Sequence, residues 1–299
     1  PDSQDSSSQE QNSDSSTDSS ASQESAAASQ EEGTLSPSSG SSTFTDNSDS
    51  SMDNVLSQVQ SLLPTDNGTW SVYVCNLAKN TEGAINDQKM QAASLIKLYI
   101  MGAVYEDYDS LSTTYGKETL DNNLNSMITV SDNESFNELV RLQTTSGVFK
   151  DGAEAVNAFL AESQFADTSV QHTLSPSASK DAGLGGRNTT SVKDCGELLS
   201  RIYKGECVSK EASEAMLNLL LNQQVTTKIP SGISASVEIA NKTGETDTDQ
   251  HDIAIVYGEK TTYILCVMSE NCKSGDAVSH IRDISGIVYN YLNMRLDQD

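Results

Sequence analysis

The sequence predicts an α/β (α+β) fold in which a single antiparallel sheet is assembled from both ends of the folded part of the chain. Two observations support this prediction. Strand patterns occur once early and three times late, and the long middle, from about 92 to 225, is mostly helical. We therefore expect the helical middle to form an inserted subdomain, with a cleft between it and the sheet.

The expected elements follow in order along the chain. An amphipathic helix opens near Asp53, a candidate N-cap, and ends before Pro64. A strand rich in Val, Tyr and Trp is predicted over residues 68–78, and the last helix over residues 276–294. Between them, helices are predicted over residues 125–130, 134–143, 152–162, 191–205 and 210–223, and strands over residues 237–244, 251–258 and 261–269.

Residues 1–51 differ in composition from the rest of the chain. They are mostly Ser, Asp, Gln, Glu and Ala, with Phe44 as their one aromatic residue and no Lys or Arg. Such a stretch buries too little apolar surface to offset the entropy of ordering it. We therefore expect a disordered tether over residues 1–51 and one folded domain over residues 52–299.

The charge pattern limits the kinds of partner. The formal net charge is −25, and the first basic residue in the chain is Lys79. Nucleic acid and anionic lipid both require a basic face, so neither is an expected partner. An anionic small molecule would have to be bound by a few local lysines, and we expect the domain to act as a monomer.

The chain start, the hydropathy and the cysteines bear on location and cofactors. The sequence begins at Pro1 rather than Met, which favours a removed secretory signal and hence a secreted or extracytoplasmic cell-surface protein, with an N-terminal lipid anchor as one form. The apolar run over residues 95–104 is shorter than the roughly 20 residues of a membrane span.

The cysteines are odd in number and match no metal-ligand spacing, so we predict no metal, no cofactor and no particular disulfide. They are Cys75, Cys195, Cys207, Cys266 and Cys272.

The stretch AASLIKLYIMGAVYE, residues 92–106, is an apolar helix that contains one lysine, Lys97. Burying a lysine costs free energy unless its charge is paired or lost, whereas a long stem can also carry the charge out to water. Ser94 lies three residues earlier, on the same helical face. The pair suits a nucleophile whose proton is taken by a desolvated lysine, although an ordinary helix with a serine near its start has the same pattern.

Two further motifs follow. Ser131, Asp132 and Asn133 stand directly before a helix, where such residues commonly act as N-caps. Lys242, Thr243 and Gly244 lie at the end of a predicted strand, where they would also fit an ordinary strand end turning into a loop. Together, Ser-x-x-Lys, Ser-Asp-Asn and Lys-Thr-Gly in this order are the motif set of active-site serine β-lactamases and penicillin-binding proteins.

From Met52 to the C-terminus the sequence resembles the class A β-lactamase family. The family's nucleophile helix resembles AASLIKLYIMGAVYE, and its second motif helix resembles MITVSDNESFNELV. Its third motif strand resembles NKTGET, and the segment that closes its omega loop and begins the next helix resembles RNTTSVKDCGELLSRIYKG. The resemblance implies a five-stranded antiparallel sheet flanked by helices, plus an all-helical subdomain.

The resemblance also implies catalytic roles. Ser94 would be acylated, Lys97 would activate it, and Ser131 would pass a proton to the leaving nitrogen with help from Lys242. The substrate would be a β-lactam or a peptidoglycan stem peptide.

Substrate-binding roles follow from the same resemblance. Asn133 would bind the amide side chain of the substrate, and Thr243 with Lys242 would hold its carboxylate, with Gly244 completing the motif. The backbone N–H groups of Ser94 and Glu245 would form the oxyanion hole, the kind of fixed donor pair that acyl transfer requires.

Two features depart from the family. The family's omega-loop glutamate precedes a proline and activates the deacylating water, and Ser175, before Pro176, stands at the equivalent place here. Asp167 or Asp181 could substitute for it, although neither sits in the family's motif. Fewer residues also separate Ser94 from Ser131 along the sequence than is usual in the family. Asn137, by contrast, matches the family's asparagine that supports the omega loop. The sequence therefore predicts complete acylation machinery and weak deacylation.

Three functions fit this pattern. The first is a β-lactam-opening hydrolase of the class A type with weak deacylation. The second is a D-Ala-D-Ala carboxypeptidase or transpeptidase, and the third is a module that binds β-lactams or cell-wall peptides without turnover. Neither His172 nor His251 is expected to be catalytic. His251, near the start of a strand after Lys-Thr-Gly, could contact a substrate carboxylate, but a surface position is favoured.

Overall fold

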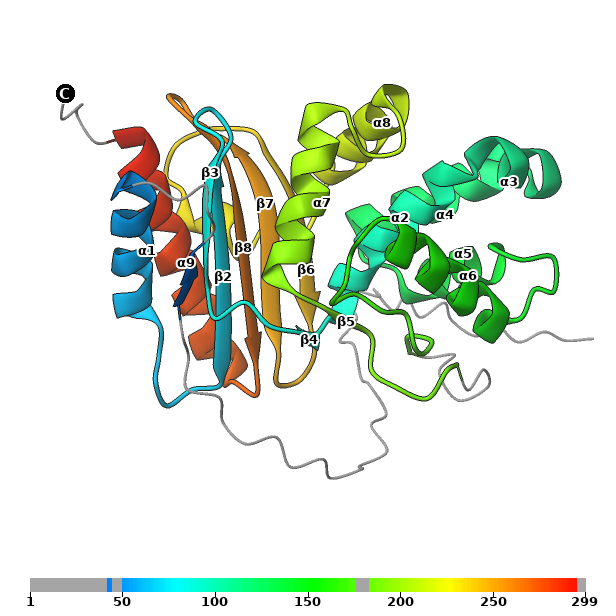
Figure 1. The fold of residues 1–299 in the computed structure, drawn as a ribbon, viewed down its shortest axis with the longest axis horizontal. Helices are drawn as coiled ribbons and strands as arrows, with labels where there is room; N and C mark the ends of the chain where they lie inside the picture. The colour runs from blue at the N-terminus through cyan, green and yellow to red at the C-terminus, as the bar shows by residue number, and fades with distance from the viewer. Residues whose placement is uncertain (1–41, 45–49, 176–182, 295–299) are drawn as a thin grey trace, which may run out of the picture.

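The computed structural model describes residues 42–44, 50–175 and 183–294 of the 299-residue chain. The strands form a sheet with helices on both faces, and a group of helices lies beside one edge of that sheet (Figure 1).

One antiparallel sheet forms the centre of the larger part, with the strand order β1-β3-β2-β8-β7-β6. In β2 and β8, Tyr73 pairs with Cys266, so the sheet joins the early chain to the late chain. The predicted five-stranded antiparallel sheet is confirmed by β2 (Thr69–Asn76), β3 (Thr81–Ile85), β6 (Ile239–Glu245), β7 (Gln250–Tyr257) and β8 (Thr262–Glu270).

Helices cover both faces of the sheet (Figure 1). On one face α1 (Ser50–Leu62) and α9 (Ser274–Tyr289) pack together, and their apolar stripes bury Val55, Val59, Ile281 and Ile284 against the strands. On the other face α7 (Val192–Lys204) lies across β2 and β8. Burial of these apolar faces is the main favourable contribution to the free energy of folding.

The helical subdomain is built around α2 (Ile96–Glu106), which follows the short 3₁₀ turn η1 (Ala93–Leu95). Residues 96–104 are all buried, because α2 is apolar on every face and its neighbours cover every face. The neighbours are α3 (Tyr108–Tyr115), α4 (Lys117–Thr129), α5 (Asn133–Arg141), α6 (Phe149–Glu162) and, bridging to β6, α8 (Lys210–Leu221).

A short two-stranded ribbon joins the chain that enters the subdomain to the chain that leads into α7. There β4 (Met90–Gln91) pairs with β5 (Thr189–Thr190), and Ala92 N donates to Asn188 O at 2.8 Å. This two-stranded ribbon fixes the base of the loop that precedes α7.

Several sequence predictions need correction. The early chain holds β3 as well as β2, and β3 was missed because its sequence TEGAI is short and contains Glu82 and Gly83. The helix α7 covers the sheet and is not part of the helical subdomain, and α1 begins at Ser50 rather than after Asp53. In the predicted tether, β1 (Ser42–Phe44) pairs with β3, so the prediction of disorder is wrong for those three residues.

The five cysteines are all buried as free thiols. In the described ranges, no helix combines the length and apolar composition that crossing a membrane requires.

The contact between α7 and β2 gives a test of the sheet packing. A Cβ added at Gly196 would lie 2.2 Å from Cε1 of the buried Tyr73 ring, which also bonds to Glu82. Gly196→Ala should therefore lower the free energy of unfolding by about 1–3 kcal/mol through overpacking. Gly275→Ala is the matched control, since Gly275 is also helical and nothing lies within 4 Å of its added Cβ. Chemical denaturation in which both variants match wild type would contradict this packing.

Candidate active site

The nucleophile candidate stands where the 3₁₀ turn η1 passes into α2. Ser94 is nearly fully buried, and Lys97, one turn later, is 0% exposed, so the alternative of a lysine reaching solvent is excluded. Lys97 Nζ lies 2.8 Å from Ser94 Oγ. Ala93, directly before the serine, has φ of +45°, a backbone conformation that costs free energy in a non-glycine residue and is typical of functional sites.

Lys97 is surrounded by oxygen atoms from a second segment. Its Nζ donates to Ser131 O at 2.6 Å, Ser131 Oγ at 3.0 Å and Asn133 Oδ1 at 2.6 Å, in addition to Ser94. An ammonium has three N–H donors, so these four oxygens exceed what it can satisfy at one time. The surplus acceptor permits more than one hydrogen-bonding and protonation arrangement.

The N-terminus of α5 supplies this second segment. Asp132 is the N-cap, and its Oδ2 accepts from Ser135 N at 2.6 Å, so the capping interpretation of the motif holds for this residue. Ser131 stands before the cap with φ of +60°, which aims both its hydroxyl and its carbonyl at Lys97. Asn133 is the first helical residue and faces the same lysine.

The third motif reaches the same hydroxyl from the sheet. Lys242 on β6 is fully buried, and its Nζ donates to Ser131 Oγ at 2.9 Å and to Thr243 O at 2.8 Å. Ser131 Oγ thus lies between the nitrogens of Lys97 and Lys242. The three motifs, far apart in the sequence, form one connected hydrogen-bonded group.

Gly244 lets β6 approach the turn η1, which carries the candidate nucleophile Ser94. A Cβ added there would lie 3.2 Å from Ala92 O, from Leu95 N and from Leu95 Cγ. The edge strand therefore runs along the start of α2, beside Ser94. Thr243 is buried and Glu245 is partly exposed at the end of the strand.

Three asparagines hold the loop that precedes α7. Asn157 exchanges two hydrogen bonds of 2.8 Å with the backbone of Val170, and Asn137 exchanges two of 2.8 Å with Leu174. Asn188 bonds to the backbone of Gln171 and His172 between them. The resemblance pointed to Asn137, whereas Asn157 and Asn188 gave no sequence signal beyond being asparagines beside a loop.

The residues considered for deacylation lie on or near this loop. Ser175 is partly exposed and follows the anchored Leu174 directly, while Asp181 lies outside the described residues. Asp167 lies at the loop base, where its N–H donates to Asp194 at 2.9 Å and its carbonyl accepts from Thr189. Burial raises the pKa of the Asp194 carboxyl, which accepts from the Asp167 N–H and stands in the first turn of α7.

One of the two histidines differs from expectation. His251 on β7 is completely buried rather than at the surface, with Nε2 2.9 Å from Gln91 O and Nδ1 accepting from Ser269 N at 3.2 Å. Burial lowers the pKa of His251 to about 4. Its position opposite Gly244 in the sheet was misjudged because the sequence did not show that β4 covers it. His172 is partly buried, and its Nδ1 lies 2.7 Å from Thr173 O.

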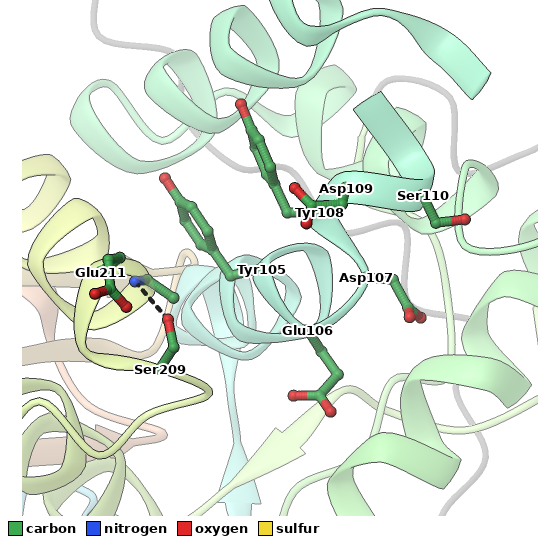
Figure 2. Close-up of a pocket in the computed structure, with 9 residues that line it drawn as sticks. Tyr105, Glu106, Asp107, Tyr108, Asp109, Ser110, Ser209 and Glu211 are labelled. Carbon is green, nitrogen blue, oxygen red and sulfur yellow. Dashed lines mark hydrogen bonds between the residues drawn. The ribbon is translucent and has the colours of Figure 1, made fainter. Parts of the chain in front are cut away.

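A pocket of about 500 Å³ lies away from this group, where α2 passes into α3 near the start of α8. Figure 2 shows the Tyr105 and Tyr108 side chains on one side and Ser209 with Glu211 on the other. Ser94 precedes α2, whereas Glu106 ends it, so about 16 Å of helix separates the two sites. The acidic lining makes this pocket a poor place for an anionic substrate. Its residues are Tyr105, Glu106, Asp107, Tyr108, Asp109, Ser110, Ser209, Glu211 and Ala212.

The fold and the group around Ser94 define a hydrolase of the serine β-lactamase superfamily. The chain belongs to the β-lactamase enzyme family, whose model matches residues 54–115 and 111–292. A comparison with curated proteins gave no match.

Solved structures agree on the fold. The structure of PBP-A is 23% identical with a TM-score of 0.68, covering 79% of this chain and 95% of that chain. A β-lactamase from Sphaerobacter thermophilus is 19% identical with a TM-score of 0.68, covering 82% and 99%. An ancestral class A β-lactamase is 18% identical with a TM-score of 0.65, covering 78% and 98%. At this level of identity, the similarity establishes the fold alone. The activity has to be inferred from the residues of the candidate site.

The loop anchors give a second test. Asn137→Ala removes two buried hydrogen bonds to one backbone unit and should lower the free energy of unfolding by about 2–4 kcal/mol, whereas Asn157→Ala removes two partly buried ones and should cost about 1–3 kcal/mol. Amide hydrogen exchange should separate them, because Asn137→Ala frees the Leu174 amide and Asn157→Ala frees the Val170 amide. Equal increases at both amides in both variants would instead mean that the loop opens as one unit.

Proposed function

We propose that this protein is an acyl-serine hydrolase of the class A type that opens β-lactam rings quickly and deacylates slowly. The observation that supports this most directly is the connected group in which Lys97 contacts Ser94 and Ser131 while Lys242 contacts the same Ser131 hydroxyl. No purely structural requirement calls for two buried lysines on one hydroxyl.

The contacts of Lys97 suit a general base. A neutral amine has two N–H groups and one lone pair, and the carbonyl oxygens of Ser131 and Asn133 can only accept. These two oxygens use both N–H groups, so the lone pair is left for a hydroxyl, and Ser94 Oγ at 2.8 Å can donate to it. Lys97 would then take the proton as Ser94 Oγ attacks the lactam carbonyl carbon.

Ring opening needs a proton on the departing nitrogen. The N–H groups of Ser94 and Glu245 would hold the tetrahedral oxyanion, and collapse of the intermediate would break the C–N bond. Ser131 would donate its hydroxyl proton to that nitrogen and recover one from Lys97, which lies 3.0 Å away. Lys242, at 2.9 Å, would stabilise the alkoxide character of Ser131 during the transfer.

Substrate contacts complete the proposal. Because Asn133 Oδ1 faces Lys97, its Nδ2 is the group that would donate to the amide side chain of the substrate. Thr243, with Lys242 and the neighbouring Gly244, would take the carboxylate.

The deacylation step is expected to be slow. Ser175 occupies the place where the family carries its water-activating glutamate, and a serine is a poor general base. General-base assistance contributes about 10²- to 10⁴-fold, so the acyl-enzyme should persist.

A second candidate is a D-Ala-D-Ala carboxypeptidase or transpeptidase, which uses the same acyl-serine chemistry. The lack of the loop glutamate and the likeness to PBP-A favour it, and a point mutant of PBP-A has been captured as an acyl-enzyme complex with penicillin G. A third candidate is a module that binds without turnover, and the missing glutamate is the one observation that favours it. We further propose that the protein is located outside the cytoplasm, where it would encounter peptidoglycan peptides and β-lactams.

Acylation is tested by mass spectrometry after exposure to benzylpenicillin. Wild type should gain the mass of the penicillin, and Ser94→Ala should not. Lys97→Met should fold but acylate at least about 10²-fold more slowly, because it lacks the base. An adduct that persists in Ser94→Ala would refute the assignment of the nucleophile, and a normal rate in Lys97→Met would place the base elsewhere.

Deacylation is tested separately by following the adduct over time. Hydrolysis traces of wild type should show a burst followed by slow turnover, and Ser175→Glu should shorten the lifetime of the adduct by about 10-fold or more. Ser175→Gln is the matched control, since it has a similar side-chain size without a base. Efficient wild-type turnover with no accumulating adduct would show that another group supplies the base.

A further inference from the structure

His251 is a fully buried histidine that the proposed acyl-transfer steps do not use. Its Nδ1 accepts from Ser269 N at 3.2 Å, so this nitrogen carries no proton. The proton of the neutral imidazole therefore lies on Nε2, which donates to Gln91 O at 2.9 Å. Because burial lowers the pKa of His251 to about 4, the ring is neutral at neutral pH. His251 thus links the central sheet to the carbonyl of Gln91 in β4.

Glu270, at the end of β8, holds the other backbone polar group of Gln91. Its carboxylate accepts a hydrogen bond from Gln91 N, and its side chain is only 13% exposed. Arg187 lies 3.4 Å from the Glu270 carboxylate and 3.4 Å from Oε1 of Gln91. Both the N–H and the carbonyl of Gln91 are therefore bound by side chains that belong to the sheet.

The next residue, Ala92, is held from the other direction. Gln91 pairs with Thr189 of β5, and Ala92 N donates to Asn188 O at 2.8 Å. The short segment of residues 91–92 is thus bonded to the sheet through Gln91 and to the chain that leads into α7 through Ala92.

This doubly held segment leads directly into the turn that carries Ser94. Ala93 has φ of +45°, and a strained backbone of this kind persists only where the surrounding contacts fix it. Gln91 lies three residues before Ser94, whose N–H is also one of the two proposed oxyanion donors. A shift of this turn would therefore displace both the attacking oxygen and a donor that must be preorganised.

We propose that His251 and Glu270 are positioning residues for Ser94. By holding the carbonyl and the N–H of Gln91, they fix the turn η1 in the geometry that both nucleophilic attack and oxyanion binding require. They act through the backbone of residues 91–94 and not on the substrate. This inference rests on the proposed function and adds the residues that keep its nucleophile in place.

The test follows acylation by benzylpenicillin with mass spectrometry over a series of penicillin concentrations. Three quantities are measured, namely the maximal rate constant, the half-saturating concentration and the final fraction of protein that is acylated. A positioning role changes the maximal rate constant, because a misplacement of about 1 Å can slow a reaction about 10²-fold. A merely structural role would instead lower the final fraction, since the protein that remains folded would react at the wild-type rate.

Two pairs of variants separate the hydrogen bonds from the space that the side chains fill. His251→Leu lacks the donor to Gln91 O and should lower the maximal rate constant about 10-fold or more, with little change in the half-saturating concentration. Glu270→Leu lacks the acceptor and should act in the same direction. His251→Gln can still donate and Glu270→Gln can still accept, so each should recover most of the lost rate.

Val59→Ala is the control for loss of stability alone. Val59 is fully buried in the core beneath α1, on the sheet face opposite α7. This variant should lower the melting temperature and leave the maximal rate constant unchanged.

Maximal rate constants that match wild type in folded His251→Leu and Glu270→Leu would overturn this inference and leave the proposed function standing. Losses that are equal in the Leu and Gln variants would overturn it as well, because the hydrogen bonds would then not be their cause. If His251→Leu does not fold, the Glu270 pair decides the matter. Failure of wild type to be acylated would instead overturn the proposed function and this inference with it.

Discussion

The burial of Lys97 in an apolar helix is the constraint on which the rest of the site depends. A buried amine without partners would cost several kcal/mol, so the fold must bring oxygen atoms to it. They come from Ser94 on the preceding turn and from Ser131 and Asn133 at the start of α5. Meeting this need accounts for the positive φ of Ser131 and for the close packing of α5 on α2. The atoms that stabilise the buried Lys97 are thus the same atoms that form the catalytic arrangement we propose.

The sheet contributes to the site through its edge strand. Because Gly244 has no side chain, β6 can lie against the turn that carries Ser94, and Lys242 then reaches the Ser131 hydroxyl that Lys97 also contacts. The chain has a net charge of −25, yet three buried lysines lie in this region. Lys97 contacts the Ser131 turn, Lys228 contacts the end of β6, and Lys242 on β6 contacts the Ser131 hydroxyl. Local positive charge here offsets the general acidity that would otherwise exclude an anionic substrate.

The loop before α7 combines firm anchoring with altered chemistry. Three asparagines, Asn137, Asn157 and Asn188, fix the loop backbone from Val170 to Leu174. The residue directly before Ser175 is therefore held in place. A loop that is held in this way but carries Ser175 in place of the glutamate is in line with the slow deacylation that we propose.

The sequence by itself determined the motifs, their order, the antiparallel sheet drawn from both chain ends and the apolar helix around Lys97, because these depend on local periodicity and on residue chemistry. It could not determine that His251 is buried under β4, that α7 covers the sheet, or that Ser42–Phe44 pairs with β3. Nor did it single out Lys228, a lysine in an unremarkable turn sequence, as the partner of Glu245. Only the tertiary structure decided these points, because each depends on which distant segment covers a residue, and periodicity within one segment carries no information about its neighbours.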